Sequence, residues 1–273
     1  MKRETIVIGI LAMLAMSGIA IAAEGDLGIT FDTTWVSKYI WRGVDRMGDK
    51  ASIQPSVNFD LGNGFSAGVW AAYGCASDTV NATEYNYSLT YAGTACEGTA
   101  NQLAYAVSWI YYDFIDQPST AADAQEINLS VAMPNLCPGG VVPSYTIVKM
   151  WGSESSSAAS DISGWIHVIG LDYALTVDGF IENNPEQVID LSWDITYNDG
   201  AGVPGTLSKT TGVIAPSNVD HDWSHMTFGA STAIELPGAG TITPGIFYQV
   251  TMDKSVNPDS DELWTGISYS LSF

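Results

Sequence analysis

The residues ELWTGISYSLSF, at positions 262–273, give the clearest indication of the fold. These residues alternate between two sets along the whole run. One set is mainly apolar and comprises Leu263, Thr265, Ile267, Tyr269, Leu271 and Phe273. The other is mainly small or polar and comprises Glu262, Trp264, Gly266, Ser268, Ser270 and Ser272. Because side chains alternate between the two faces of a β-strand, this period of two predicts a strand with one apolar face and one polar face.

A terminal strand of this kind resembles the closing strand of a bacterial outer-membrane β-barrel, in which a C-terminal phenylalanine is a familiar ending. The last residue of this stretch is Phe273. The resemblance implies that the rest of the chain supplies further two-faced strands.

Further strands of this type follow one another along the chain. The clearest pair is a hairpin in which residues 52–61 and 65–73 alternate on either side of Gly62-Asn63-Gly64, a tight-turn sequence. The predicted strands cover residues 27–43, 52–61, 65–73, 84–91, 103–111, 126–133, 141–151, 164–175, 189–197, 225–236, 242–252 and 262–273. Many are close to the roughly 9 to 11 residues that a tilted transmembrane strand needs. The sequence therefore predicts an all-β fold, a transmembrane antiparallel up-and-down β-barrel of about 12 strands over residues 24–273.

The predicted links differ in length according to whether they follow an even-numbered or an odd-numbered strand. Those after even-numbered strands cover residues 62–64, 92–101, 134–140, 176–187 and 237–241, whereas those after odd-numbered strands are mostly longer or more charged, above all 198–222. Short turns on one side, longer loops on the other and an even strand number are typical of outer-membrane barrels. We expect both termini on the short-turn, periplasmic side.

A soluble β-sandwich or lipocalin-like barrel is the alternative fold. It would have to bury many Trp and Tyr residues in one core, and these aromatics lie near strand ends more often than in mid-strand. Trp and Tyr at strand ends suit the aromatic girdles at membrane interfaces. A sheet in hydrocarbon must also close on itself, because its backbone polar groups find no other partners there. The pattern favours the membrane barrel.

Residues 1–23 have the pattern of a cleaved secretory signal peptide. Lys2 and Arg3 precede an apolar run over residues 6–16, and small residues surround the expected cleavage site at Ala22-Ala23. The alternative is a retained N-terminal membrane helix. No later stretch approaches the 18 or more apolar residues of a spanning helix. We therefore expect export and a location in the cell outer membrane, in contact with its lipid.

The chain is strongly acidic. It contains 9 Lys and Arg against 30 Asp and Glu, and removal of residues 1–23 leaves 7 against 29. Only 14% of residues are charged, whereas a soluble domain usually carries about a quarter. Such a surface repels phosphate backbones, so nucleic acid is not an expected partner.

The N-terminal third resembles the TorF-like family of outer-membrane porins. The resemblance rests on VSKYIWRG at residues 36–43, on Gln54-Pro55, and on Gly64-Phe65 followed by Gly68-Val69-Trp70. It implies an outer-membrane location and a barrel architecture. Lys38 stands where the family pattern has Asp, so the resemblance assigns no lumen role to this position.

The polar faces of the strands predict an acidic pore wall. The acidic candidates are Asp32, Asp60, Glu84, Glu126, Asp172, Asp190, Asp194, Glu235 and Glu262, with Lys38 and Arg42 as a basic strip on the first strand. Such a wall favours cations and neutral polar solutes. Twelve strands lie between about eight, which side chains fill, and about 16 to 18, which leave a channel. We expect a passive, weakly cation-preferring diffusion channel for small polar or cationic solutes, without a cofactor; a closed structural or adhesion barrel is the alternative.

Other chemistry has weaker support in the sequence. His221 and His225 would share a strand face, near Asp220 and Asp222, but a solvated loop rim is the more usual meaning of such a cluster, as it is for Asp259, Asp261 and Glu262. No metal site is expected. The histidines lie in no catalytic motif, so an enzyme is not expected, and an outer-membrane hydrolase is the remote alternative.

Three cysteines lie in predicted links or at a strand end. Cys96 and Cys137 would lie on neighbouring periplasmic links and could form a disulfide, with Cys75 free at the opposite end. Three unpaired thiols are the alternative.

Overall fold

The computed structural model describes residues 28–76, 83–154, 162–181, 184–204 and 221–273. The predicted signal peptide and most of the predicted 198–222 loop lie outside the described residues. Among the described residues, no helix has the length and apolar character needed to cross a membrane.

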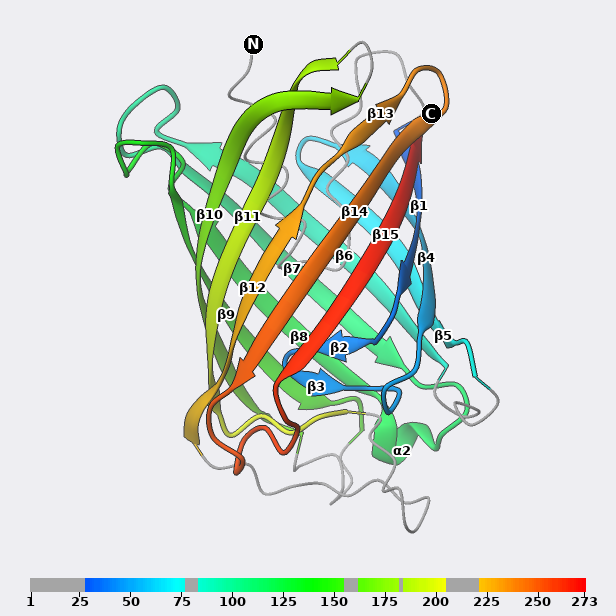
Figure 1. Cartoon of the computed structure of the whole chain (residues 1–273). Coiled ribbons are helices and arrows are strands. Elements are labelled where there is room, and N and C mark those ends of the chain that lie inside the picture. Colours follow the sequence, from blue (N-terminus) through cyan, green and yellow to red (C-terminus); the bar gives the residue numbers. More distant parts are fainter. Residues whose placement is uncertain (1–27, 77–82, 155–161, 182–183, 205–220) are drawn as a thin grey trace.

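The chain forms a closed antiparallel β-barrel (Figure 1). Its wall consists of β1 (Ile29–Val36), β4 (Ser52–Gly62), β5 (Phe65–Gly74), β6 (Glu84–Ala95), β7 (Leu103–Asp113), β8 (Ala124–Ala132), β9 (Val142–Gly152), β10 (Gly164–Ile181), β11 (Asn184–Asp199), β12 (His221–Ser231), β13 (Ile234–Leu236), β14 (Gly240–Thr251) and β15 (Glu262–Ser272). From β4 to β12 each wall strand pairs with the next one in the chain, and β1 pairs with β4 on one side and with β15 on the other. β12 and β13 pair with successive parts of β14, which pairs with β15. Since β12 and β13 together form one side of the pairing with β14, the wall has the predicted 12 strands, and the predicted all-β barrel is confirmed.

The two faces of the wall follow the predicted parity. Along β1 and β15, Phe31 is opposite Leu271 on the outside, while Thr34 is opposite Ser268 on the inside, and the two hydroxyls are 3.0 Å apart. Phe31 and Ile267 expose about half of their surface on this outer face, and none of the described residues covers them. Such an apolar outer face is the one that hydrocarbon would cover.

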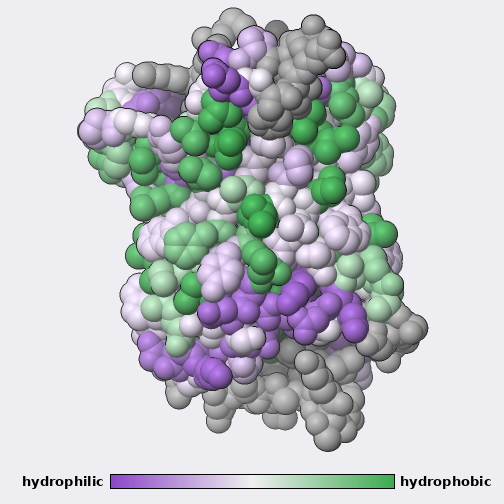
Figure 2. Space-filling model, in the orientation of Figure 1, coloured by the Kyte–Doolittle hydropathy of each residue, from purple (hydrophilic) through white to green (hydrophobic). Residues whose placement is uncertain are grey.

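The distribution of apolar residues over the surface agrees with this assignment of the faces. Figure 2 shows hydrophobic residues over the upper and central parts of the visible face and a concentration of hydrophilic residues below them. Outward-facing aromatics gather near both ends of the strands. Phe65 packs on Tyr91 near the termini, with ring centroids 4.8 Å apart, and Tyr73 packs on Tyr85 near the other end, at 6.0 Å. These positions match the expected girdles.

Links at the two ends differ in length, as predicted. At the end where β1 begins and β15 ends, the links include residues 63–64 and 237–239; at the opposite end they include 37–51, 114–123 and 252–261. The predicted link at 176–187 was too long, because β10 and β11 stay paired as far as Asp178 and Glu186 and beyond. At the opposite end, the short helix α2 (Ser119–Ala122) lies between β7 and β8.

The predicted first strand, 27–43, was also too long. β1 ends at Val36, and the next residues leave the wall and fold into the barrel, where they form the small hairpin of β2 (Ile40–Trp41) and β3 (Val44–Asp45). Figure 1 shows this hairpin beside the lower end of β15, near the end of the barrel opposite the C-terminus. We refer to residues 37–51 as the inner segment.

Candidate lumen site

The inner segment reverses direction at Arg42 and Gly43. Trp41 pairs with Val44 across the turn, and the two central residues have φ values of 46° and 88°. Positive φ at both central positions is typical of a two-residue hairpin turn, and glycine adopts it without a steric penalty. This turn places the basic side chains of the segment inside the barrel rather than on the wall. The expectation that Lys38 and Arg42 lie on the first strand is therefore wrong.

Apolar packing holds the inner segment in place. Tyr39, Trp41 and Met47 are almost fully buried. Tyr39 packs on Trp70 of β5, with ring centroids 5.7 Å apart, and Trp41 packs on Tyr112 of β7, at 5.9 Å. Trp70 is a large aromatic residue on the otherwise small face of residues 65–73, and its inward position in this core explains the exception. The barrel thus has a small hydrophobic core at this level.

The basic side chains of the inner segment contact glutamates of the wall. Nζ of Lys38 lies 2.6 Å from Oε2 of Glu262, and Nη2 of Arg42 donates a 2.9 Å hydrogen bond to Oε1 of Glu126. Nη2 of Arg46 lies 3.8 Å from Oε2 of Glu84. Three of the predicted pore carboxylates are thus neutralised by the inner segment, and the field at this level is weaker than the sequence suggested.

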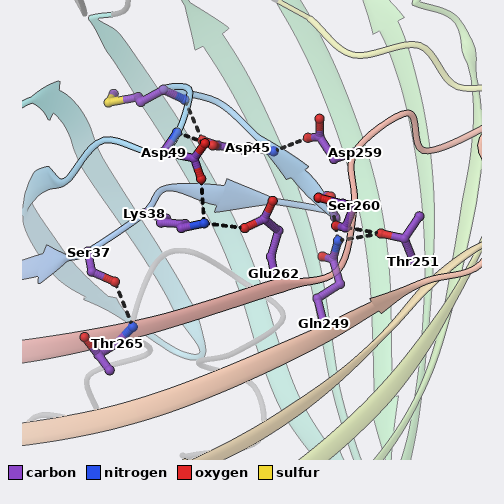
Figure 3. Close-up of polar contacts among 12 residues, drawn as sticks. Ser37, Lys38, Asp45, Asp49, Gln249, Thr251, Asp259, Ser260, Glu262 and Thr265 are labelled. Carbon is purple, nitrogen blue, oxygen red and sulfur yellow. Dashed lines mark hydrogen bonds and ion pairs between the residues drawn. The ribbon is translucent and has the colours of Figure 1, made fainter.

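Lys38 also binds a carboxylate within its own segment. Its Nζ lies 2.5 Å from Oδ1 of Asp49 as well as close to Glu262 (Figure 3). The hydrogen bond with Asp49 and then the one with Glu262 raise the pKa of the Lys38 ammonium above its usual value. The charge of Lys38 is therefore stabilised by its two partners.

The backbone of Gly43 lies directly against β14 and the link that follows it. Its carbonyl oxygen accepts hydrogen bonds from Nε2 of Gln249, at 2.8 Å, and from Nδ2 of Asn257, at 2.9 Å. A Cβ atom at Gly43 would lie 2.4 Å from Nδ1 of the buried His225 and 2.6 Å from Nδ2 of Asn257. Only glycine fits here.

Backbone contacts add two further anchors, both visible in Figure 3. The amide nitrogen of Asp45 donates to Oδ2 of Asp259 at 2.7 Å, and the amide of Thr265 donates to Oγ of Ser37 at 3.0 Å. Both anchors tie the inner segment to the chain around β14 and β15. The segment is therefore held at its first residue, at its turn and directly after the turn.

A second group of carboxylates lies on the inward faces of β10 and β11. Asp172 is opposite Ser192, and Asp190 and Asp194 flank Ser192 on the same face. Asp194 interacts with the hydroxyl group of Thr227, its cross-strand neighbour on β12. Within the described part of the chain, no salt bridge involves any of the three. We call these three residues the acidic wall.

The remaining predicted wall acids have local partners. Asp32 of β1 accepts from Nδ2 of Asn58 at 3.2 Å, and Asp60 accepts from the amide of Gly62 at 2.8 Å. Glu235, on β13 near the termini, accepts from the hydroxyl group of Thr241 at 3.0 Å. The predicted residues therefore do not form one site: the glutamates around the inner segment are paired, and the acidic wall is separate from them.

The histidines do not share a face. A β-bulge shifts the register between Thr196 and Tyr197, so that His225 points inward and is buried, whereas His221 is exposed and contacts Asp199. The expected i and i+4 arrangement of His221 and His225 is thus wrong, and Asp220 lies outside the described residues. No metal-binding group of three or more His, Cys, Asp or Glu is found within the described ranges.

The cysteines are free in this structure. Cys75, Cys96 and Cys137 form no disulfide, so the hypothetical bond between Cys96 and Cys137 is not present. The two links concerned are nevertheless neighbours, because Nδ2 of Asn135 donates to the carbonyl oxygen of Thr99 at 3.0 Å.

Sequence reasoning missed several residues of the site. Arg46, Gln249 and Asn257 contact partners far away in the chain, and their positions in the sequence carry no signal of this. Trp70 did carry one, since a large aromatic on an otherwise small and polar face indicates a local apolar environment inside the barrel.

Comparisons with known proteins agree with the barrel. A family model described as a bacterial protein of unknown function, Gcw_chp, matches residues 20–243. No curated protein matches the sequence. The resemblance to the TorF-like group stays a prediction.

Several solved structures share the fold. LpxR from Salmonella typhimurium is 10% identical, with a TM-score of 0.51, over 89% of this chain and 100% of that one. The NanC porin is 8% identical, with a TM-score of 0.50, over 89% of this chain and 98% of that one. The KdgM porin is 7% identical, with a TM-score of 0.48, over 89% and 99%. At these identities the likeness to the first two concerns the fold alone.

Proposed function

The chain belongs to the Gcw_chp family of bacterial proteins, whose function is unknown, and we propose that it is an outer-membrane channel for the passive diffusion of small polar solutes, with a weak preference for cations. The acidic wall is the observation that carries this proposal. Asp172, Asp190 and Asp194 face the lumen from two adjacent strands, and the described structure pairs none of them with a basic side chain. Carboxylates that line a pore attract cations and repel anions.

The outer face supports the location. Its exposed apolar side chains, with aromatics near both ends, suit a barrel surrounded by lipid. The signal-peptide pattern of residues 1–23 would direct export to the envelope. In this orientation the termini lie on the periplasmic side, and the inner segment enters the barrel from the outer side.

The inner segment forms the constriction in this proposal. Its ion pairs neutralise the glutamates beside it, so selectivity arises mainly at the acidic wall. Solute flux is limited where Tyr39 and Trp41 pack against the wall. Such a channel has a low conductance while the inner segment is in place, and its conductance rises when the segment moves.

Reversal potentials in planar bilayers test the proposal. In a potassium chloride gradient, Asp190→Asn with Asp194→Asn reduces cation preference, because two pore carboxylates are lost. The matched control is Asp113→Asn with Asp199→Asn, which removes two carboxylates from outward positions on β7 and β11. If correctly folded protein gives no conductance steps, or if both double variants shift the potential equally, the proposal is wrong.

A closed structural or adhesion barrel is the second candidate, and the buried packing of the inner segment favours it. Such a barrel gives no conductance while the inner segment is in place. Conductance steps from the unaltered, correctly folded protein would exclude it.

A hydrolase has less support. Oγ of Ser224 lies 2.9 Å from Nδ1 of His225, but both residues are buried, and no described hydrogen bond joins His225 to a carboxylate. Hydrolysis of a lipid or peptide by the purified protein, lost in Ser224→Ala, would favour this function.

A further inference from the structure

Two aromatic side chains face the lumen from β14 and β15, next to the inner segment but outside the apolar core that surrounds it. Phe247 and Trp264 are directly opposed in the register, on the inward parity of their strands. Their rings are stacked, with centroids 5.4 Å apart and planes at 19°. Both are only partly buried, so an aromatic surface lies within an otherwise polar part of the wall.

This aromatic pair lies in the same cross-strand row as the acidic wall. The register joins Trp264, Phe247, Gly229, Ser192 and Asp172 across β15, β14, β12, β11 and β10. Asp190 and Asp194 lie in the inward rows on either side of this one, opposite Ser231 and Thr227. The rings and the three carboxylates thus border one continuous patch of the lumen surface.

Gly229 brings the two parts of the patch together. A Cβ atom at this position would lie 2.9 Å from Cδ1 of Phe247 and 2.4 Å from Oγ of Ser192. The ring of Phe247 therefore occupies the space above Gly229 and extends toward β11, which carries Asp190 and Asp194. Because adjacent strands are about 4.8 Å apart, the backbones of β11 and β14 are separated by only about 10 Å.

Aromatic rings beside carboxylates favour one chemical class of solute, organic cations. The faces of aromatic rings attract cations, and methylated ammonium groups also gain from apolar contact with the rings. The carboxylates at the edge of the patch also attract cations, and their electric field is stronger in a narrow lumen. An anion gains neither contribution, and a neutral solute gains only the apolar contact.

We propose that Phe247, Trp264 and the acidic wall form a lumen subsite for small organic cations that carry an alkylated ammonium group. This rests on the proposed function, since it names a substrate class for that channel. The subsite delays such cations beside the rings, on the periplasmic side of the inner segment.

Calorimetry on the full chain folded in detergent micelles tests the subsite without requiring transport. The probes are choline and its uncharged isostere 3,3-dimethylbutan-1-ol, which differ in the ammonium charge at nearly the same shape. Choline binds, and the isostere binds about tenfold more weakly. Trp264→Leu weakens choline binding about tenfold as well, because the larger ring is lost.

Controls separate the subsite from general effects. Trp35→Leu removes a tryptophan from the outward face of β1 and leaves choline binding unchanged. Phe247→Leu replaces Trp264→Leu if the latter fails to fold, as judged by heat-modifiable migration on gels. Asp190→Asn with Asp194→Asn weakens binding of choline but not of the isostere.

Equal binding of choline and the isostere, tighter binding of a neutral sugar such as glucose, or unchanged choline binding in both aromatic variants would overturn the subsite. Choline binding without any conductance would refute the channel but support the subsite. Cation-selective conductance without choline binding would refute the subsite alone.

Discussion

Arg42 and Glu126 form an ion pair inside the barrel, with Nη2 of Arg42 2.7 Å from Oε2 of Glu126. Arg42 belongs to the turn of the inner segment and Glu126 to β8, which is five strands from β1 in the wall. The Glu126 side chain is 1% exposed and that of Arg42 is 19% exposed. Together with the contact between Lys38 and Glu262 of β15, this pair makes the inner segment a bridge across the lumen.

Arg42→Gln should release the turn of the inner segment. Removal of one partner leaves Glu126 as a buried, unpaired carboxylate, which costs about 3–5 kcal/mol when a buried pair is broken. We expect larger or more frequent conductance steps than in the unaltered protein. Planar-bilayer recordings measure this.

Lys149→Gln is the matched control for Arg42→Gln. Lys149 lies on the outside of β9, with Nζ 5.1 Å from the ring centroid of Trp165, so its loss should leave the conductance unchanged. The exchange Arg42→Glu with Glu126→Arg should restore much of the closure. Identical recordings from the unaltered protein and Arg42→Gln would contradict the bridging role.

Gly43→Ala should displace the inner segment by steric clash. The new methyl group would meet His225 and Asn257 at 2.4 and 2.6 Å, and the positive φ of 88° adds backbone strain. We expect increased conductance with little loss of barrel content in circular dichroism spectra.

Gly238→Ala is the control that separates the effect of the steric clash from the effect of backbone strain. Gly238 also has a positive φ, of 71°, but a Cβ atom there would have no neighbour within 4 Å. It should therefore conduct like the unaltered protein. If both alanine variants open the channel equally, the close contact at Gly43 is not what holds the segment.

The barrel could be predicted from the sequence because the alternation of side chains that indicates it lies within each single strand. Alternation in 52–61, 65–73 and 262–273 follows directly from which side chains meet lipid and which meet the lumen. Repetition of this pattern gave the strand number, and link lengths gave the side on which the termini lie.

The inner segment was not readable, for an equally physical reason. Tyr39 and Trp41 continue the parity of Phe31 and Trp35, so the period of two cannot tell an apolar side chain in lipid from one buried inside the barrel. The contact between Arg42 and Glu126 joins residues 84 positions apart and exists only because the chain turns inward after Val36. Trp70, Ile110 and Tyr112 interrupt the small or polar inward parity of their strands, and all three belong to this core.

Lys38 should hold the inner segment well into alkaline solution. Asp49 and then Glu262 raise the pKa of Lys38 in the folded protein. The stability that charged Lys38 gives to the inner segment is therefore complete below the usual lysine pKa. This stability is lost only as the pH rises through the higher pKa of the folded state. We expect the closing effect of Lys38, measured as the difference in opening frequency between the unaltered protein and Lys38→Met, to stay constant from about pH 8 to the usual lysine pKa of about 10.4. Lys38→Arg serves as the control that keeps the charge. A difference that disappears near pH 9 would contradict these contacts.

Leu191→Arg should hinder membrane insertion. Leu191 lies on the outward face near the middle of β11, is 38% exposed, and pairs with Tyr173 and Ala230 on its two neighbours. An arginine on the lipid face costs about 2–4 kcal/mol near the midplane of the bilayer, whereas the same side chain in the lumen stays solvated.

Asp190→Arg is therefore the control, since it places the same side chain one residue away on the inward face. The yield of heat-modifiable protein folded into lipid vesicles measures both variants, and we expect a reduced yield for Leu191→Arg alone. The reverse order would mean that the two faces of the wall are exchanged, and the acidic wall would then face lipid rather than a pore.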